Sequence, residues 1–337
     1  MQVAVITGAS AGAGRATAEA FARRGTSIAL LARGKTRLDA AARSVDALGG
    51  RALPLCVDVA DEDAVDEAAA RVEEKLGPID VWINNAMATV FSRFRDISPQ
   101  EFRRASDVTY LGSVWGTRAA LRRMVPRDCG TIVQVGSALA YRGIPLQSPY
   151  CGAKHALQGF IESVRTELMH DRSHVRLTMV QLPALNTPQF SWGRAHLPNH
   201  PQPVPPIYQP EVAAEAIMWA AEHGPRELWV GWPTVRAILG DKLAPGLGDL
   251  LLARKGFDAQ QLDEPLDPER PDNLESPAPG NWGAHGRFDG SARLSSPLFR
   301  LRTHRRAVCA LAGAVATGIV VCSTRRARSG LKHIVAG

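Results

Sequence analysis

One tyrosine and one lysine in this sequence are spaced for proton chemistry. Tyr150 and Lys154 lie four residues apart in the stretch QSPYCGAKHALQGF, which is typical of a helix. Residues at this spacing share one face of a helix, so both side chains would face the same neighbour. A free phenol has a pKa near ~10, and an adjacent ammonium favours the phenolate and lowers that pKa. We therefore predict that Tyr150 is a general acid/base and that Lys154 lowers its pKa.

A glycine-rich turn near the start of the sequence is suited to hold a phosphate. Gly8, Gly12 and Gly14 follow the apolar run VAVIT and precede a helical pattern. Glycines let the backbone approach a pyrophosphate closely, and the helix N-terminus that follows offers free N–H groups and a partial positive charge. The succession of strand, turn and helix predicts a dinucleotide-binding loop, in which we include Ser10 and Arg15.

Short apolar runs alternate with amphipathic helical stretches along the first part of the chain. Strands are predicted at 3–7, 27–32, 52–59, 79–85, 130–136 and 175–182, and a helix at 210–224 and a strand at 227–231 follow. Alternation of this kind implies a parallel sheet with helices on both faces. We expect an α/β protein with a Rossmann-type doubly wound parallel sheet, in one catalytic domain over residues 1–255.

The loop spacing TGxxxGxG and the Tyr-x-x-x-Lys pair together resemble the short-chain dehydrogenase/reductase family, over residues 1–235. The resemblance implies an oxidoreductase that transfers hydride between a nicotinamide dinucleotide and a small-molecule carbonyl or secondary alcohol, and it implies a homo-oligomer. It also assigns further positions: Ser137 to the substrate oxygen, Lys154 to the nicotinamide ribose, Asp58 to adenine, Asn84 to the fourth strand beside the cofactor, and Thr187 to the carboxamide.

The end of the second predicted strand bears on the choice of cofactor. An acidic residue there would accept a hydrogen bond from the ribose 2′-hydroxyl of NAD, whereas the 2′-phosphate of NADP favours a cation. Ala32 stands at that position and Arg33 follows it, with Arg15 nearby in the glycine loop. We therefore predict NADP (NADPH), with NAD less favoured, and Arg33 as the 2′-phosphate ligand.

Several positions depart from the family's usual pattern. Thr109 stands where many members have an Asn that anchors a relay water, and Met87 stands where Gly is usual. Leu182 and Pro183 replace a Pro-Gly pair. These departures leave open a second function, a low-turnover NADP(H)-binding sensor or scaffold that the C-terminal tail tethers to a membrane.

The segment after Thr187 is rich in proline and contains Phe190, Trp192 and Tyr208. This segment is predicted to cover the crevice at the carboxyl ends of the strands, where ligands bind in this fold class. A lid with aromatic side chains suits an apolar or bulky carbonyl compound, and a connecting loop whose aromatics pack on the body is the alternative. We predict no metal site, because the sequence has no Cys/His cluster with zinc-ligand spacing.

The composition changes near Gly256. Residues 256–303 are rich in Pro, Gly, Asp and Ser, which predicts a flexible linker. Residues 304–337 form a basic segment in which 307–323 carries no charge, and this stretch is read as a membrane anchor, a docking helix or a disordered end.

Charge and cysteine content limit the partners and the compartment. Nine of the 40 Lys and Arg residues lie after Gly290, in a stretch without Asp or Glu. The remaining body is slightly acidic, so we predict no nucleic-acid partner. Five scattered cysteines favour a reducing compartment. We expect a cytoplasmic protein, with membrane association through 307–323 left open.

Overall fold

The computed structural model describes residues 2–267 and 269–303. The described chain up to Ser296 forms one compact unit, and the short helix α11 (Pro297–Thr303) belongs to a second. The basic segment 304–337, with its predicted apolar stretch at 307–323, lies outside the described residues. Within the part of the chain that is described, no helix combines the length and apolar character needed to cross a membrane.

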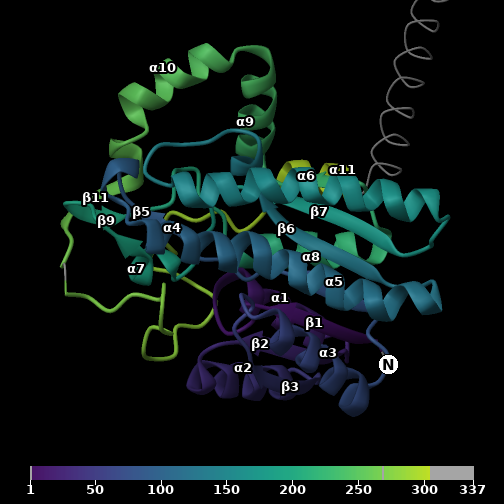
Figure 1. Ribbon diagram of the computed structural model, residues 1–337. Coiled ribbons are helices and arrows are strands. Elements are labelled where there is room, and N and C mark those ends of the chain that lie inside the picture. Colours follow the sequence, from purple (N-terminus) through teal and green to yellow (C-terminus); the bar gives the residue numbers. More distant parts are fainter. Residues whose placement is uncertain (1, 268, 304–337) are drawn as a thin grey trace, which may run out of the picture. The chain divides into compact units, whose positions relative to one another are not determined.

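Seven parallel strands form the central sheet, in the order β10-β7-β6-β4-β1-β2-β3 (Figure 1). Each strand comes from an apolar run, as in β1, which is buried along its whole length. Burial on both faces fits an all-parallel sheet. The strands are β1 (Val3–Thr7), β2 (Ser27–Ala32), β3 (Arg51–Cys56), β4 (Val81–Asn84), β6 (Thr131–Ser137), β7 (Arg176–Leu182) and β10 (Glu227–Trp229).

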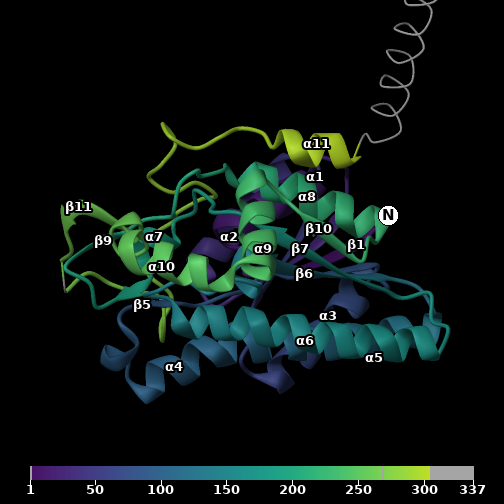
Figure 2. The ribbon, with the colours of Figure 1, turned by 90° about the horizontal axis from the view of Figure 1, so that it is seen from above.

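Helices cover both faces of this sheet (Figure 2). One face carries α1 (Gly12–Ala22), α2 (Lys35–Ala47) and α8 (Pro210–His223), and the other carries α3 (Glu62–Leu76), α5 (Gly112–Met124) and α6 (Ser148–His170). Local sequence sets their ends, since the Asp61 side chain caps α3 by accepting from the N–H of Ala64, and Gly77 with φ +101° ends it. The predicted Rossmann-type doubly wound sheet is thus confirmed.

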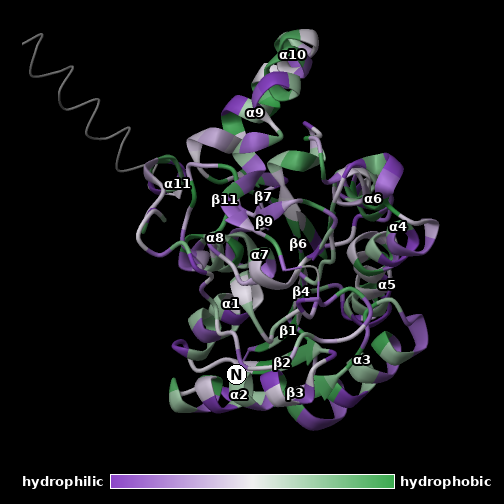
Figure 3. Ribbon diagram, turned by 90° about the vertical axis from the view of Figure 1, so that its left-hand side faces the viewer, coloured by the Kyte–Doolittle hydropathy of each residue, from purple (hydrophilic) through white to green (hydrophobic). Residues whose placement is uncertain are grey.

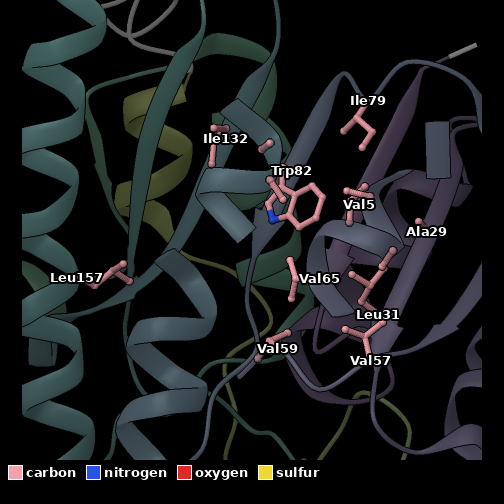
Figure 4. Packing of buried hydrophobic residues seen from close by; sticks show 14 of the residues in the cluster. Val5, Ala29, Leu31, Val57, Val59, Val65, Ile79, Trp82, Ile132 and Leu157 are labelled. Carbon is pink, nitrogen blue, oxygen red and sulfur yellow. The ribbon is translucent and has the colours of Figure 1, made fainter. Parts of the chain in front are cut away.

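The core lies between the sheet and the helices α3, α5 and α6, around the fully buried Trp82 (Figure 4). Its neighbours are aliphatic side chains from the strands and from α3, including Val5, Val65 and Ile132. The indole N–H of Trp82 donates to the side-chain oxygen of Asn84 at 2.8 Å. A buried indole needs such a partner, and this one ties the end of β4 to the core.

Smaller elements surround the carboxyl ends of the strands. They are the strand pairs β5 (Val90–Phe91) with β8 (Arg194–Ala195) and β9 (Asn199–Pro201) with β11 (Gln261–Pro265), and the helices α4 (Pro99–Ser106) and α7 (Gln189–Trp192). Helices α9 (Trp232–Leu243) and α10 (Pro245–Lys255) project from the body as a hairpin (Figures 1 and 3). Arg142 holds both helices of this hairpin, because it pairs with Asp241 and Asp249.

Residues 256–296 differ from the predicted flexible linker. Within this stretch β11 pairs with β9, Leu274 is fully buried, and Ala278 is buried. Leu274 belongs to the main hydrophobic cluster. A few well-placed apolar side chains and many backbone hydrogen bonds order this polar stretch, which its average composition does not reveal.

Candidate functional site

A cavity of about 810 Å³ opens at the carboxyl ends of the parallel strands. This edge is where ligands bind in open α/β sheets. The loops after six strands contribute predicted site residues or their neighbours: Gly8, Ser10 and Gly12 after β1, Arg33 after β2, Asp58 after β3, Asn85 after β4, Ser137 at the end of β6 and Thr187 after β7. Tyr150 and Lys154 of α6 line the same cavity.

The glycine loop has the backbone shape that a dinucleotide site requires. Gly8 and Gly12 adopt φ of +66° and +58°, in the left-handed region that favours glycine. Gly14 does not line the cavity, but a Cβ there would stand 2.3 Å from the carbonyl oxygen of Gly8. The three glycines therefore let the loop pass tightly into the N-terminus of α1, and this cradle fits a pyrophosphate.

Ser137, Tyr150 and Lys154 come together beside the sheet. Tyr150 lies in the first turn of α6 and Ser137 is the last residue of β6. The ammonium of Lys154 donates to the carbonyl of Val135 at 2.7 Å and lies 5.5 Å from the centre of the Tyr150 ring. A hydrogen bond joins Ser137 and the phenol of Tyr150. The three side chains thus form one cluster that can hold and move a proton.

Burial dominates the ionisation of this cluster. It raises the pKa of Tyr150 to about 12, and the hydrogen bond with Ser137 offsets only part of that rise. Burial also lowers the pKa of Lys154 to about 8. Burial thus outweighs the hydrogen bond that lowers the pKa of Tyr150, and the lowering of this pKa by Lys154 stays a prediction. The phenol of Tyr150 therefore holds its proton at neutral pH.

Arg33 lines the cavity, but residues far along the chain hold its guanidinium. It donates to the carbonyls of Leu274 at 3.0 Å and Glu275 at 2.8 Å, and also to that of Asn273. Burial is the main reason why its pKa is lowered. The sequence could not show these partners, because they lie more than two hundred residues away.

Asp58 is likewise engaged by a residue that sequence reasoning missed. Its carboxylate pairs with Arg104 at 2.5 Å. Burial works to raise the pKa of Asp58, but the hydrogen bonds from Arg104 and the backbone of Ala60 outweigh it, so the pKa is lowered. Asp58 is therefore a fixed negative charge in the cavity wall.

A second missed residue is Arg37 of α2. It lines the cavity, and its guanidinium lies 4.8 Å from the centre of a Trp192 ring. Burial, followed by the charge of Arg33, lowers its pKa. The signal was present in the sequence ARGKTR, where a second arginine follows Arg33 by one helical turn.

Asn84 and Arg15 do not line the cavity. The side-chain amide of Asn84 accepts from Trp82 and donates to the Ser113 carbonyl at 3.2 Å and to the Thr117 hydroxyl at 3.1 Å. Arg15 pairs with Glu19 and donates to the carbonyl of Ala40. Both side chains thus have hydrogen-bond partners within the fold, and the neighbouring Asn85 lines the cavity, while the predicted cofactor contacts of Asn84 and Arg15 stay predictions.

Thr109 lies in a π-helical turn, Asp107–Leu111, between α4 and α5. Its buried hydroxyl donates to the carbonyl of Ala88 at 2.8 Å and accepts from the N–H of the same residue at 2.9 Å. Thr109 does not line the cavity. Its hydroxyl therefore supports the loop after β4, and no free amide stands there to anchor a water.

The far half of the cavity is largely apolar. The segment after Thr187 contributes Phe190 and Trp192, both buried, while the third predicted aromatic, Tyr208, is buried without lining the cavity. The α9–α10 hairpin adds further lining: Pro233, Ala237, Leu247, Leu251 and Leu252. Met87, Leu182 and Pro183, the departures from the family pattern, also lie in the cavity wall.

Comparison with known proteins agrees with this site. The profile of the family described as short chain dehydrogenase matches residues 2–195. The chain is 31% identical over 321 residues, 95% of its length and 89% of the relative's, to an uncharacterized oxidoreductase, YxnA, of Bacillus subtilis. It is 31% identical to 3-dehydrosphinganine reductase of Danio rerio, over 65% of this chain and 68% of that protein.

Solved structures show the same likeness. A short-chain dehydrogenase from Streptomyces avermitilis is 28% identical with a TM-score of 0.63, covering 76% of this chain and 99% of that one. An alcohol dehydrogenase from Thermococcus sibiricus, complexed with 5-hydroxy-NADP, is 29% identical with a TM-score of 0.58, covering 68% and 96%. With its glycine loop, its parallel sheet and its matched profile, the chain belongs to the short-chain dehydrogenase family of oxidoreductases.

Proposed function

We propose that this protein reduces a ketone with an apolar chain to a secondary alcohol, with NADPH as the hydride donor. The observation that carries the proposal is the cluster of Ser137, Tyr150 and Lys154 in the wall of the cavity that also contains the glycine loop. A proton donor, an oxygen-positioning hydroxyl and an ammonium thus lie within reach of one ligand.

In this proposal the bound nicotinamide dinucleotide supplies the hydride. Tyr150 holds a phenolic proton and donates it to the substrate oxygen, and the hydroxyl of Ser137 orients that oxygen. The raised pKa of Tyr150 keeps the proton in place at neutral pH, which suits a donor. The ammonium of Lys154 then stabilises the phenolate that remains.

The preference for NADP is supported by the charge at the end of β2. Ala32 stands where an acidic residue would favour NAD, and both Arg33 and Arg37 line the cavity beyond it. The solved relative from Thermococcus sibiricus carries an NADP derivative. Of the two arginines, Arg37 has fewer competing acceptors, since its guanidinium lies over an aromatic ring.

The choice of an apolar substrate is supported by the far half of the cavity. Its lining includes aromatic side chains of the segment after Thr187 and leucines of the α9–α10 hairpin, which also contributes Arg236, Asp241 and Lys255. Leu247 and Leu251 line the cavity and are also 58% and 51% exposed. These two leucines offer an apolar chain a surface at the open side of the cavity. The likeness to 3-dehydrosphinganine reductase, named for a long-chain ketone, points the same way.

A series of methyl ketones of increasing alkyl length tests this proposal. Oxidation of NADPH and of NADH would be followed with each compound. We expect kcat/KM to rise severalfold with each added methylene, since burying one is worth about 0.8 kcal/mol, and to be higher with NADPH. Turnover that is indifferent to chain length, or restricted to small charged carbonyls, would refute the substrate class.

The second candidate function is a sensor or scaffold that binds NADP(H) with little turnover. It is favoured by Thr109, whose hydroxyl is bonded to the backbone of Ala88 at the position where many family members have an Asn that anchors a relay water. A chain that binds NADPH tightly but reduces no ketone or aldehyde of the series would support this second function over the first.

A further inference from the structure

Residues 273–288, which we call the strap, contact Arg33 and Gly12 in the wall of the cavity, and Asn273 at their start lines the cavity itself. At its first end, three successive backbone carbonyls at 273–275 accept hydrogen bonds from the guanidinium of Arg33. One nitrogen of Arg33 makes two of these bonds, at 3.0 and 2.8 Å, and so uses both of its hydrogens. The strap thus occupies most of the donor capacity of the residue best placed to meet a 2′-phosphate.

Further along, the strap meets the glycine loop. The carbonyl of Gly283 accepts from the N–H of Gly12 at 3.0 Å, and Gly12 is the first residue of α1. The N–H of Gly286 donates to the carbonyl of Asn186, next to Thr187. A free N–H at a helix N-terminus is the kind of donor that binds a pyrophosphate. Here a neutral carbonyl of the chain's own backbone holds it.

Specific side chains fix the strap in this position. Leu274 is fully buried in the main hydrophobic cluster. Trp282 packs edge-on against Trp192, with ring centres 5.3 Å apart. Just beyond the strap, Asp289 accepts hydrogen bonds from Asn186 at 2.7 Å and Gln209 at 2.9 Å. Three separate anchors therefore hold the carbonyls against their donors.

A phosphate is a stronger acceptor than a carbonyl for the same donors, since it carries a negative charge of its own that pairs with the charge of an arginine. The pyrophosphate is common to NAD and NADP, whereas only NADP brings a second phosphate to Arg33. We infer that the strap competes with nucleotide phosphates for Gly12 and Arg33: a pyrophosphate replaces the carbonyl of Gly283, and only a 2′-phosphate also replaces the carbonyls at 273–275. This inference rests on the proposed dinucleotide-dependent function.

If the strap competes with the nucleotide, variants that lose one of its anchors should have a higher affinity for NADP⁺. A site that is free in only part of the molecules binds with an affinity reduced by that fraction. We expect Trp282→Ala and Asp289→Ala to bind NADP⁺ about threefold to tenfold more tightly, the change that follows from loss of one aromatic pair or of one set of hydrogen bonds. The matched control, Leu294→Ala, removes an exposed leucine of the same stretch and should leave binding unchanged.

Titration calorimetry with NADP⁺ on the full chain measures these affinities. Two anchors are used because each loses a different contact, and a variant that fails to fold is recognised by circular dichroism. If both folded variants bind NADP⁺ as tightly as the parent chain, or more weakly, the strap does not compete and the inference is overturned.

Amide hydrogen exchange measured along the strap distinguishes the response of its two ends to NAD⁺ and to NADP⁺. With NAD⁺ we expect faster exchange only around Gly283, and with NADP⁺ we expect it at 273–275 as well. Slower or unchanged exchange across 273–288 with NADP⁺ would contradict the inference. Neither measurement needs turnover. If exchange in the strap becomes faster in a chain that reduces no ketone, the inference stands and the proposed reaction is refuted. If the chain reduces ketones but exchange in its strap does not change, the proposed reaction stands and the inference is refuted.

Discussion

At the scale of single residues, the proposed mechanism makes Lys154 the group that sets the pH range in which Tyr150 acts. Burial lowers the pKa of Lys154 to about 8, so its ammonium is present below that pH and is lost above it. Tyr150, with a pKa of about 12, stays protonated across this range. We expect kcat/KM for ketone reduction to be flat below pH 8 and to fall above it, because a neutral lysine no longer stabilises the phenolate.

A pH–rate profile of the Lys154→Arg variant is the control for this prediction. A guanidinium keeps its charge, so its profile should lose the fall near pH 8 whatever the absolute rate. A fall at the same pH in both proteins would show that another group is responsible.

Thr109 permits a second prediction at this scale. Thr109→Val leaves the buried N–H and carbonyl of Ala88 without the hydroxyl that they share, and unsatisfied buried groups cost about 1–3 kcal/mol each. Thr109→Ser keeps both bonds. Urea unfolding should therefore show a loss of about 2–6 kcal/mol in the first variant and little change in the second. Equal stability of the two would mean that the hydroxyl does not support the loop.

Tyr150, Lys154 and the glycine loop could be predicted from the sequence, because each is recognised by the spacing of residues close together in the chain. The sequence did not make the electrostatics predictable. The raised pKa of Tyr150 and the lowered pKa of Lys154 follow from burial, which the assembled domain determines. The hydrogen-bond partners of Arg33 and Asp58 could not be predicted either, because each lies in a distant part of the chain.

At the scale of elements, the α9–α10 hairpin should govern which ketones are accepted. Leu247→Ser and Leu251→Ser replace apolar cavity lining and should lower kcat/KM for the longest ketones on the order of tenfold. Short ketones should be unaffected, because they do not reach the hairpin. Leu250 offers a matched control, since it is 56% exposed and does not line the cavity. An equal loss in Leu250→Ser would assign the effect to the helix rather than to the cavity.

The strands and the main helices were predictable as elements, because continuous apolar runs and amphipathic periods follow directly from the parallel sheet. Residues 256–296 were not. Their composition is that of a linker, yet Leu274 is fully buried and β11 pairs with β9. Average polarity does not reveal a stretch that is ordered by one buried leucine and by backbone hydrogen bonds to distant loops.

At the scale of the whole molecule, the folded unit extends to Ser296, past residue 255, where the sequence predicted the catalytic domain to end. A chain that ends after Thr303 should therefore unfold in urea at nearly the same concentration as the full chain. A chain that ends before Leu274 should lose at least the ~2–5 kcal/mol typical of removing a buried leucine. If both truncations unfold like the full chain, the segment adds nothing to the stability of the domain.

The most direct measurement of the central claim compares Tyr150→Phe with the parent protein in NADPH-dependent ketone reduction and in NADPH binding. The substitution removes one hydroxyl from a buried cluster and leaves the glycine loop intact. The proposed mechanism predicts a loss in kcat of about 10²–10⁴-fold with the dissociation constant for NADPH nearly unchanged. Turnover that survives the substitution would contradict the assignment of Tyr150 as the proton donor.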